Sequence, residues 1–237
     1  MIDKIKSIFI IPELRSRIVF TLGVLVIVRM GAHIPIPGVN GEVLAMAFDN
    51  LKSGLFGLFN TFVGGAFQKA SLFSLGIMPY ISSSIIIQLM GSVVPYFQRL
   101  QKEGEAGRKK ITQITRYGTV MLSTMQSYGV VAVFLPSLSS NGQQAVNNPG
   151  LMFTFTGIVS MVTGTLFLMW LGERITERGI GNGISLIIMV GIVSAFPNVI
   201  LNEITMVQSG ARGLLAEFIL VGIMFLIICF VVLLTQG

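Results

Sequence analysis

The side chains that commonly carry chemistry are few in this sequence, and their spacing does not suit catalysis. His33 is the one histidine among 237 residues, so two histidines cannot share a metal ion and no His-Glu-x-x-His motif exists. An intramembrane serine protease needs a serine and a histidine that meet inside the membrane, whereas His33 adjoins the prolines of 34–38. Cys229, the one cysteine, has no partner for a disulfide within the chain. We therefore expect no catalysis, no metal and no cofactor.

Three glycines spaced two apart, Gly179, Gly181 and Gly183, match part of a phosphate-binding loop. That motif requires a strand leading into the loop and a nucleotide-sized fold behind it. Here the glycines join two apolar stretches of membrane-helix length. We expect no nucleotide binding, because the tolerance of glycine for tight turns explains the pattern.

Composition indicates a membrane protein. Hydrophobic residues make up 53% of the chain and charged residues 11%, and the mean hydropathy is +0.82. A soluble domain has about 25% charged residues. Since backbone groups in lipid must pair internally, long apolar stretches predict helices. We expect an all-α, polytopic membrane helix bundle in one domain, 1–237, with about six transmembrane helices, at about 17–34, 72–96, 117–135, 151–171, 180–200 and 215–235.

The distribution of basic residues predicts the orientation. The net charge of +6 arises from residues in short segments beside apolar stretches, which is an orientation signal before it is a nucleic-acid signal. With a cytoplasmic N-terminus, twelve Lys and Arg fall on the cytoplasmic side and three fall outside, with Arg29 inside the first helix. We expect both chain ends in the cytoplasm. Residues 1–17 have one apolar helical face and are predicted to lie on the membrane surface.

One apolar segment is too short to span. Residues 54–67 (GLFGLFNTFVGGAF) precede the second predicted helix, and Gly64 and Gly65 weaken their far end. This length suits a re-entrant or interfacial half-helix. An irregular segment at membrane depth must lie against protein or a water-filled cavity, so the segment hints at a cavity. A surface-lying connector is the plainer alternative.

Four stretches together resemble the SecY family of protein-conducting channels. They are 29–38 (RMGAHIPIPG), 75–89 (LGIMPYISSSIIIQL), 103–118 (EGEAGRKKITQITRYG) and 170–185 (WLGERITERGIGNGIS). The resemblance runs along the whole chain but covers about half of the family's architecture, which has ten spans in two inverted halves. It implies the N-terminal half of an inverted-repeat channel in a bacterial plasma (inner) membrane. We therefore expect the chain alone not to translocate a precursor.

The resemblance also implies partners. These are the SecE and SecG subunits, the SecA motor or the ribosome on the cytoplasmic face, and signal sequences and translocating polypeptides. The basic segment 97–116, with Arg108, Lys109 and Lys110, would offer that cytoplasmic face, while its charge alone predicts attraction to anionic lipids. Direct nucleic-acid chemistry is not expected.

Several site residues follow from the same resemblance. The short segment becomes a movable plug at 54–69, with candidate residues Phe56, Phe59, Asn60, Gly64 and Gly65. One side of the lateral gate is assigned to Ser83, Ile87 and Gln88. The pore ring is assigned to Ile77, Ile81, Ile184 and Ile188.

Spacing and motif carry different parts of the ring assignment. Each pair of isoleucines is four residues apart and shares a helical face. Spacing alone favours lipid-facing or packing roles, because Ile85, Ile86, Ile87 and Ile187 are chemically identical neighbours. The match to the family motif reverses that preference.

Two alternative functions were weighed against the channel. An intramembrane protease is disfavoured by the position of His33. A six-helix small-solute transporter would place ionisable groups within its spans, and the second to fifth predicted helices contain none between their ends.

Overall fold

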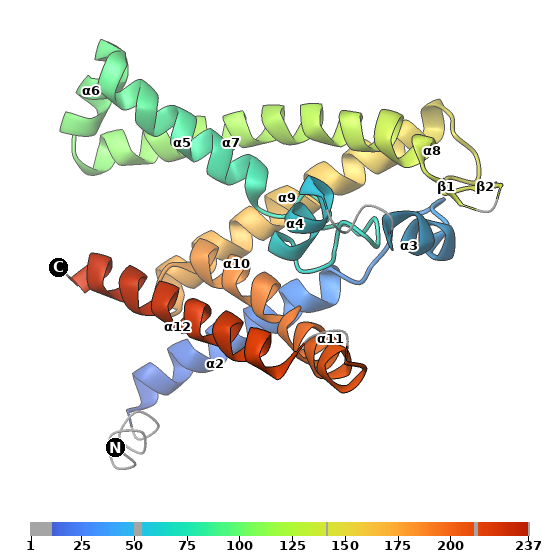
Figure 1. The fold of residues 1–237 in the computed structure, drawn as a ribbon. Helices are drawn as coiled ribbons and strands as arrows, with labels where there is room; N and C mark the ends of the chain where they lie inside the picture. Colours follow the sequence, from blue (N-terminus) through green and yellow to red (C-terminus); the bar gives the residue numbers. More distant parts are fainter. Residues whose placement is uncertain (1–10, 50–53, 141, 211–212, 237) are drawn as a thin grey trace. The chain divides into compact units, whose positions relative to one another are not determined.

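The computed structural model describes residues 11–49, 54–140, 142–210 and 213–236, and most of these are helical (Figure 1). The predicted surface helix lies largely outside this part, since residues 1–10 are not described. Two compact units are present, Met1–Val193 and Ser194–Gly237. The single domain expected for 1–237 stays a prediction.

Membrane-spanning helices dominate both units, which confirms the all-α membrane fold. Among the described residues, four helical stretches are long and apolar enough to cross a membrane: Glu105–Ser137, Leu151–Arg178, Gly183–Gln208 and Ala216–Thr235. A bent helix pair, Met78–Val93 with Pro95–Lys102, raises the count to five if it forms one span. The remaining expected span, the first at about 17–34, corresponds to α2 (Pro12–Gly31), which contains Glu13 and three arginines.

One end of the first unit is a packed cap built on short elements. Helix α3 (Gly41–Asp49) lies beside the hairpin of β1 (Ser139–Ser140) and β2 (Gln143–Gln144), which pair antiparallel. Isolated bridges join Pro35 to Ser71 and Val39 to Val146. The cap encloses a hydrophobic cluster that includes Leu44, Phe48, Phe67, Leu135 and Val146.

Helix α5 (Met78–Val93) begins later than the predicted start at residue 72. Residues 63–77 form turns, and Gly76 adopts a φ of 58° that favours glycine. Pro79 then stands in the first helical turn, where its missing N–H costs nothing. Pro95 ends the helix by excluding a helical conformation at Val94, and α6 (Pro95–Lys102) leaves at 98°.

The basic segment 97–116 was expected to be a loop between two spans, and this expectation is wrong because most of the stretch is helical. Helix α6 covers its beginning, and α7 (Glu105–Tyr128) starts after a two-residue turn at Gly104, whose φ is 68°. A carboxylate in the first turn, Glu105, offsets the basic residues that follow it at this helix terminus.

Helix α7 packs on α5 and α9 (Leu151–Arg178) through a face of small residues. Its buried positions recur at multiples of four residues: Gly107, Thr115, Thr119, Ser123 and Ser127. Small side chains let helix backbones approach closely in a membrane. The helix then widens into the π-helix η1 (Gly129–Phe134) and closes with α8 (Leu135–Ser137), which contains Pro136.

A tight glycine turn joins α9 to α10 (Gly183–Val193). The Asn182 side chain accepts hydrogen bonds from the backbone N–H groups of Ile184 and Ser185, at 3.0 and 3.3 Å, as a helix N-cap. A Cβ at Gly183 would overlap the carbonyl oxygen of Gly172 in α9. The predicted tight-turn role fits Gly181, whose φ is 72°, whereas Gly183 serves close packing on α9.

The second unit contains α11 (Phe196–Gln208) and α12 (Leu214–Gln236). The fifth span was expected to end near residue 200. Pro197, near that end, instead stands in the first turn of α11, where a proline is tolerated, and the helix continues to Gln208.

Candidate pore and plug site

The short apolar segment forms helix α4 (Leu55–Phe62), eight residues long. It ends at Val63, and Gly64 and Gly65 follow with φ values of 65° and 81°. Two successive residues in this region require glycine, so the pair sets the direction in which the chain leaves α4.

Polar and aromatic contacts connect α4 to the chain that follows it. The Asn60 side chain accepts a hydrogen bond from the Gln68 N–H at 2.9 Å, and the Gly65 N–H donates to the Asn60 carbonyl at 2.8 Å. Phe59 meets Phe67 edge to face, with ring centroids 5.1 Å apart. Asn60 therefore closes the turn that returns the chain from α4 to the packed cap.

On another side of α4, phenylalanine rings pack against one another. The Phe56 ring stacks on Phe134 of η1, with centroids 4.7 Å apart, and Phe67 stacks on Phe134 at 5.5 Å. Such pairs contribute about 0.5–1.5 kcal/mol each beyond area burial. Because Phe67 is buried in the cap cluster and Phe56 is exposed, the anchored part of 54–69 is its C-terminal end.

The glycines after α4 lie between two other helices. Arg29, in the last turn of α2, donates a hydrogen bond from Nη1 to the Gly64 carbonyl oxygen at 3.1 Å. A Cβ at Gly64 would meet Arg29 Nη1 at 2.6 Å and the Gly191 Cα of α10 at 2.9 Å. A Cβ at Gly191 would meet the Phe62 carbonyl oxygen at 2.8 Å. Backbone thus packs directly on backbone where α4 ends.

The four ring candidates lie around one hydrophobic cluster of the first unit. Ile77 is a buried member, with 4% of its surface exposed, and Ile81, Ile184 and Ile188 are partly buried against the cluster. Ile77 and Ile188 also line a cavity of about 40 Å³. Phe62 and Val63, at the end of α4, line the same cavity, so the plug and ring candidates meet there.

The neighbouring isoleucines divide into two kinds. Ile85 and Ile86 on α5 are exposed, at 50% and 45%. Ile187 is 6% exposed and lines the small cavity together with Ile188. Ile187 is therefore a packing residue in the same cluster as the ring candidates. It cannot serve as an exposed isoleucine with which to compare them.

A second, larger cavity of about 750 Å³ adjoins α4. Most of its lining is apolar and comes from α4, α5 and η1, and Ser82 and Gln126 are its polar members. The cavity that the short segment hinted at thus lies directly beside it.

The three lateral-gate candidates do not share one environment. Ser83 is buried against α7, where its hydroxyl donates a hydrogen bond to the Thr115 carbonyl at 2.9 Å. Ile87 follows on the same helical face and is half-buried. Gln88 is exposed, and its side-chain nitrogen lies 3.5 Å from the Ser84 hydroxyl. The structure therefore places Ser83 in a helix–helix contact and leaves Gln88 on the surface.

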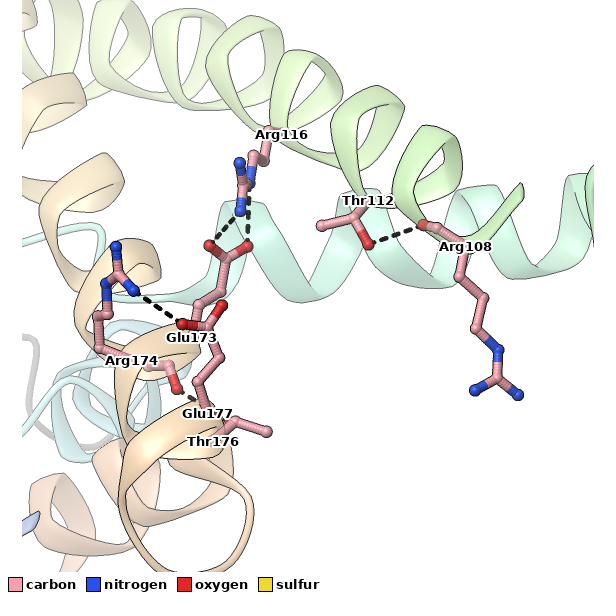
Figure 2. A network of polar contacts seen from close by, with 8 residues as sticks. Arg108, Thr112, Arg116, Glu173, Arg174, Thr176 and Glu177 are labelled. Atoms are coloured by element: carbon pink, nitrogen blue, oxygen red, sulfur yellow. Dashed lines mark hydrogen bonds and ion pairs between the residues drawn. The ribbon is translucent and has the colours of Figure 1, made fainter. Parts of the chain in front are cut away.

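The basic candidates Arg108, Lys109 and Lys110 are exposed on the first turns of α7. Further along this helix, Arg116 forms a two-pronged ion pair with Glu173 of α9, with N···O distances of 3.1 and 2.6 Å (Figure 2). Glu173 is largely covered, with 15% of its side chain exposed. The pair fastens α7 to α9.

Near this ion pair, Arg174 donates a hydrogen bond to Glu177 at 2.8 Å (Figure 2). The Arg174 guanidinium also lies 5.6 Å from the Trp170 ring centroid. Within the described ranges, no group of three or more His, Cys, Asp and Glu is placed to hold a metal ion.

Sequence reasoning missed three contributors to this site. Arg29 was read as a charge at a helix end, Gly191 was not singled out, and Phe134 was read as part of a plain span. Their partners are far away in the chain; Arg29 and Gly64, for example, are 35 positions apart. The sequence gives one sign that Arg29 has a specific partner: a charged side chain is rare in an apolar helix.

Comparison with known proteins gives consistent matches. The sequence model of the SecY family matches residues 71–237. Protein translocase subunit SecY of Escherichia coli K12 is 48% identical over 225 residues, which are 95% of this chain and 50% of that protein. The protein of the same name from Buchnera aphidicola is also 48% identical and is covered to 63%. The chain thus spans about half of the length of these relatives, or somewhat more.

Two solved structures share the fold. One is described as the structure of a protein conducting channel, with a TM-score of 0.64 and 18% identity over 91% of this chain and 47% of the other. The second is Sec61 in the canine ribosome–channel complex from the endoplasmic reticulum, with a TM-score of 0.63 at the same identity and coverage. With the family match and the bacterial relatives, these findings establish that the chain is a multi-pass membrane protein that belongs to the SecY family.

Proposed function

We propose that this chain forms the N-terminal half of a protein-conducting channel, which moves unfolded polypeptides across a membrane and releases helices into it. The observation that carries the proposal is the meeting of Ile77 and Ile188 with Phe62 and Val63 around one small cavity. A ring of apolar side chains with a short helix end packed against it can exclude water and ions when empty, because narrow apolar constrictions dewet. No part of this mechanism requires a catalytic residue.

The four isoleucines supply half of a ring in this proposal. Ile77 and Ile81 come from the start of α5, and Ile184 and Ile188 from α10, so two different helices frame the opening. Aliphatic side chains form no specific bonds with a passing chain and can change rotamer around it. The remaining ring positions and the facing side of the lateral gate would come from a second half like that of the relatives.

Helix α4 acts as the plug in this proposal, and the burial of the residues around it supports a shorter moving part than 54–69. Phe67 and Ala70 are buried in the cap cluster, whereas the described residues of α4 are partly or fully exposed. The moving part is therefore α4 and the glycines after it. The chain from Ala66 onward is the anchor.

The partners follow from the family rather than from a contact in this chain. The channel would bind SecE and SecG within the bacterial inner membrane, and SecA or a ribosome at the face that carries Arg108, Lys109 and Lys110. Anionic lipids would bind the same basic residues. Signal sequences would leave through a lateral gate to which α5 contributes. Both chain ends would be cytoplasmic.

The test uses a completed channel, made by joining this chain to the second half of the Escherichia coli relative. Ile81→Asn with Ile188→Asn should raise the resting ion conductance of reconstituted vesicles, because polar side chains keep the constriction wet. The matched control is Ile85→Asn with Ile86→Asn on the exposed face of α5. Equal conductance in the two double variants would contradict the ring.

The plug is tested in the same channel by replacing the eight residues of α4 with glycine and serine, which keeps the chain length and leaves Phe67 in place. We expect more ion leakage and a weaker requirement for a signal sequence. Wild-type tightness and stringency in this α4-replaced channel would support a surface connector instead.

A further inference from the structure

The guanidinium of Arg29 lies where α4 ends, within a site built mainly from apolar side chains and glycines. The described lining of the 40 Å³ cavity contains Arg29 as its one charged side chain, beside Phe62, Val63, Ile77 and Ile188. A cation in such a place is costly unless bonds compensate for its lost hydration. The Gly64 carbonyl supplies one such bond, at 3.1 Å.

The geometry points to Arg29 as a positioning residue that latches the plug in its closed place, an inference that rests on the proposed function. Gly64 is the first residue after the α4 cap, so its carbonyl moves with the end of the plug. The charged Arg29 side chain donates a hydrogen bond to this carbonyl. The bond therefore ties the moving part of the plug to α2, a helix that precedes the plug in the chain.

Gly191 adds a second contact to the end of the plug, close to the same glycine. The Gly191 Cα and carbonyl oxygen lie close to Gly64, and a Cβ at Gly191 would press on the Phe62 carbonyl oxygen. Gly191 belongs to α10, the helix that carries Ile184 and Ile188. The end of the plug is thus held by an arginine of α2 and by the backbone of a ring helix, and an outward shift of α10 would loosen it.

A simpler role for Arg29 is the favourable charge of a cation in the last turn of a helix. That role would act on α2 alone and would not depend on α4. Arg17 near the other end of α2 offers a matched arginine, since it pairs with Glu13 at 3.1 Å.

The latch is tested in the completed channel by Arg29→Met, with Arg17→Met as the control, through ion leakage from vesicles that contain equal amounts of folded channel. Loss of one charge-assisted hydrogen bond should raise the fraction of open plugs by roughly tenfold. Gly191→Ala should raise leakage as well, since it displaces the Phe62 backbone without removing any charge. This second variant keeps the test valid if Arg29→Met does not fold.

The decisive comparison repeats both substitutions in the α4-replaced channel. If Arg29 acts through the plug, Arg29→Met and Gly191→Ala should add no leakage there. Added leakage of equal size in both backgrounds would overturn the latch, because the residues would then act on the pore itself. If the Arg29→Met channel does not leak ions while the α4-replaced channel does, the latch is overturned and the plug is still supported. A tight α4-replaced channel would remove the plug and the latch together.

Discussion

Arg116 and Glu173 form one ion pair, but replacing either partner alone should lower the unfolding free energy by a different amount. Two opposite charges about 4 Å apart attract by about 4 kcal/mol at an effective dielectric constant of 20. Solvent screening reduces this value, since 47% of the Arg116 side chain is exposed against 15% for Glu173. We therefore expect a coupling free energy of about 1–2 kcal/mol from a double-mutant cycle.

The inequality follows from the burial of the two partners. Glu173→Gln leaves the half-exposed Arg116 to water and should cost about 1 kcal/mol of unfolding free energy. Arg116→Met strands a largely covered carboxylate and should cost about 2–3 kcal/mol.

The assay is unfolding of the purified chain by SDS in mixed micelles, followed by the fluorescence of Trp170, its one tryptophan. Trp170 stands in the same part of α9 as Glu173, so its signal reports on this region. The exposed pair of Arg17 and Glu13 is the control and should couple by at most about 0.5 kcal/mol. A coupling no larger than that, or a greater cost for Glu173→Gln than for Arg116→Met, would refute this reasoning.

Two further outcomes are expected. In a cysteine-free channel, a cysteine at Asn148 should react with an impermeant thiol reagent from outside and one at Lys109 only from the cytoplasm; the opposite pattern would reverse the topology. Gly164→Ala should destabilise the first unit by about 1–3 kcal/mol in thermal unfolding, because its Cβ would overlap a backbone carbonyl of the segment before α5. Gly23→Ala, with open space around the added atom, should have no such cost.

The positions of the spans were predictable because a membrane helix has a strong compositional signal. The stretches 117–135, 151–171 and 215–235 all lie in observed helices. Helix ends were less predictable. Pro197 reads equally well as the end of one helix or the first turn of the next, and the turns that surround it decide between them.

Boundaries also failed where a helix leaves the apolar region. Helix α7 extends twelve residues before the predicted start at 117, because Glu105 and the neighbouring α6 favour helix in a polar stretch. Hydropathy measures only how apolar a segment is, and a helix in water has no such signature. The π-helix at Gly129–Phe134 likewise depends on packing rather than on composition.

The candidate site was predictable only in its parts. Motif resemblance named Ile77 and Ile188, but their meeting with Phe62 depends on contacts between distant segments. Arg116 and Glu173 are likewise 57 positions apart, so their pairing leaves no local pattern in the sequence. Local sequence specifies helices well, whereas the approach of two helices depends on side chains and glycines from both at once.

In the proposed channel, a weakly held plug next to a firmly held anchor would suit a gate. In the anchor, Phe67 and Ala70 are buried in the cap cluster and Ala66 is buried in the cluster around the ring candidates, so moving them would expose apolar surface at a cost of about 25 cal/mol per Å². The plug end is held by a hydrogen bond from Arg29 and by glycine contacts that bury little side-chain surface. In the proposed channel, an entering polypeptide would have to displace these contacts together with the ring contacts of Phe56 with Phe134 and of Phe59 with Phe67. In this proposal, the main role of the glycines is not flexibility. They let the plug pack closely while the free energy needed to release it stays small.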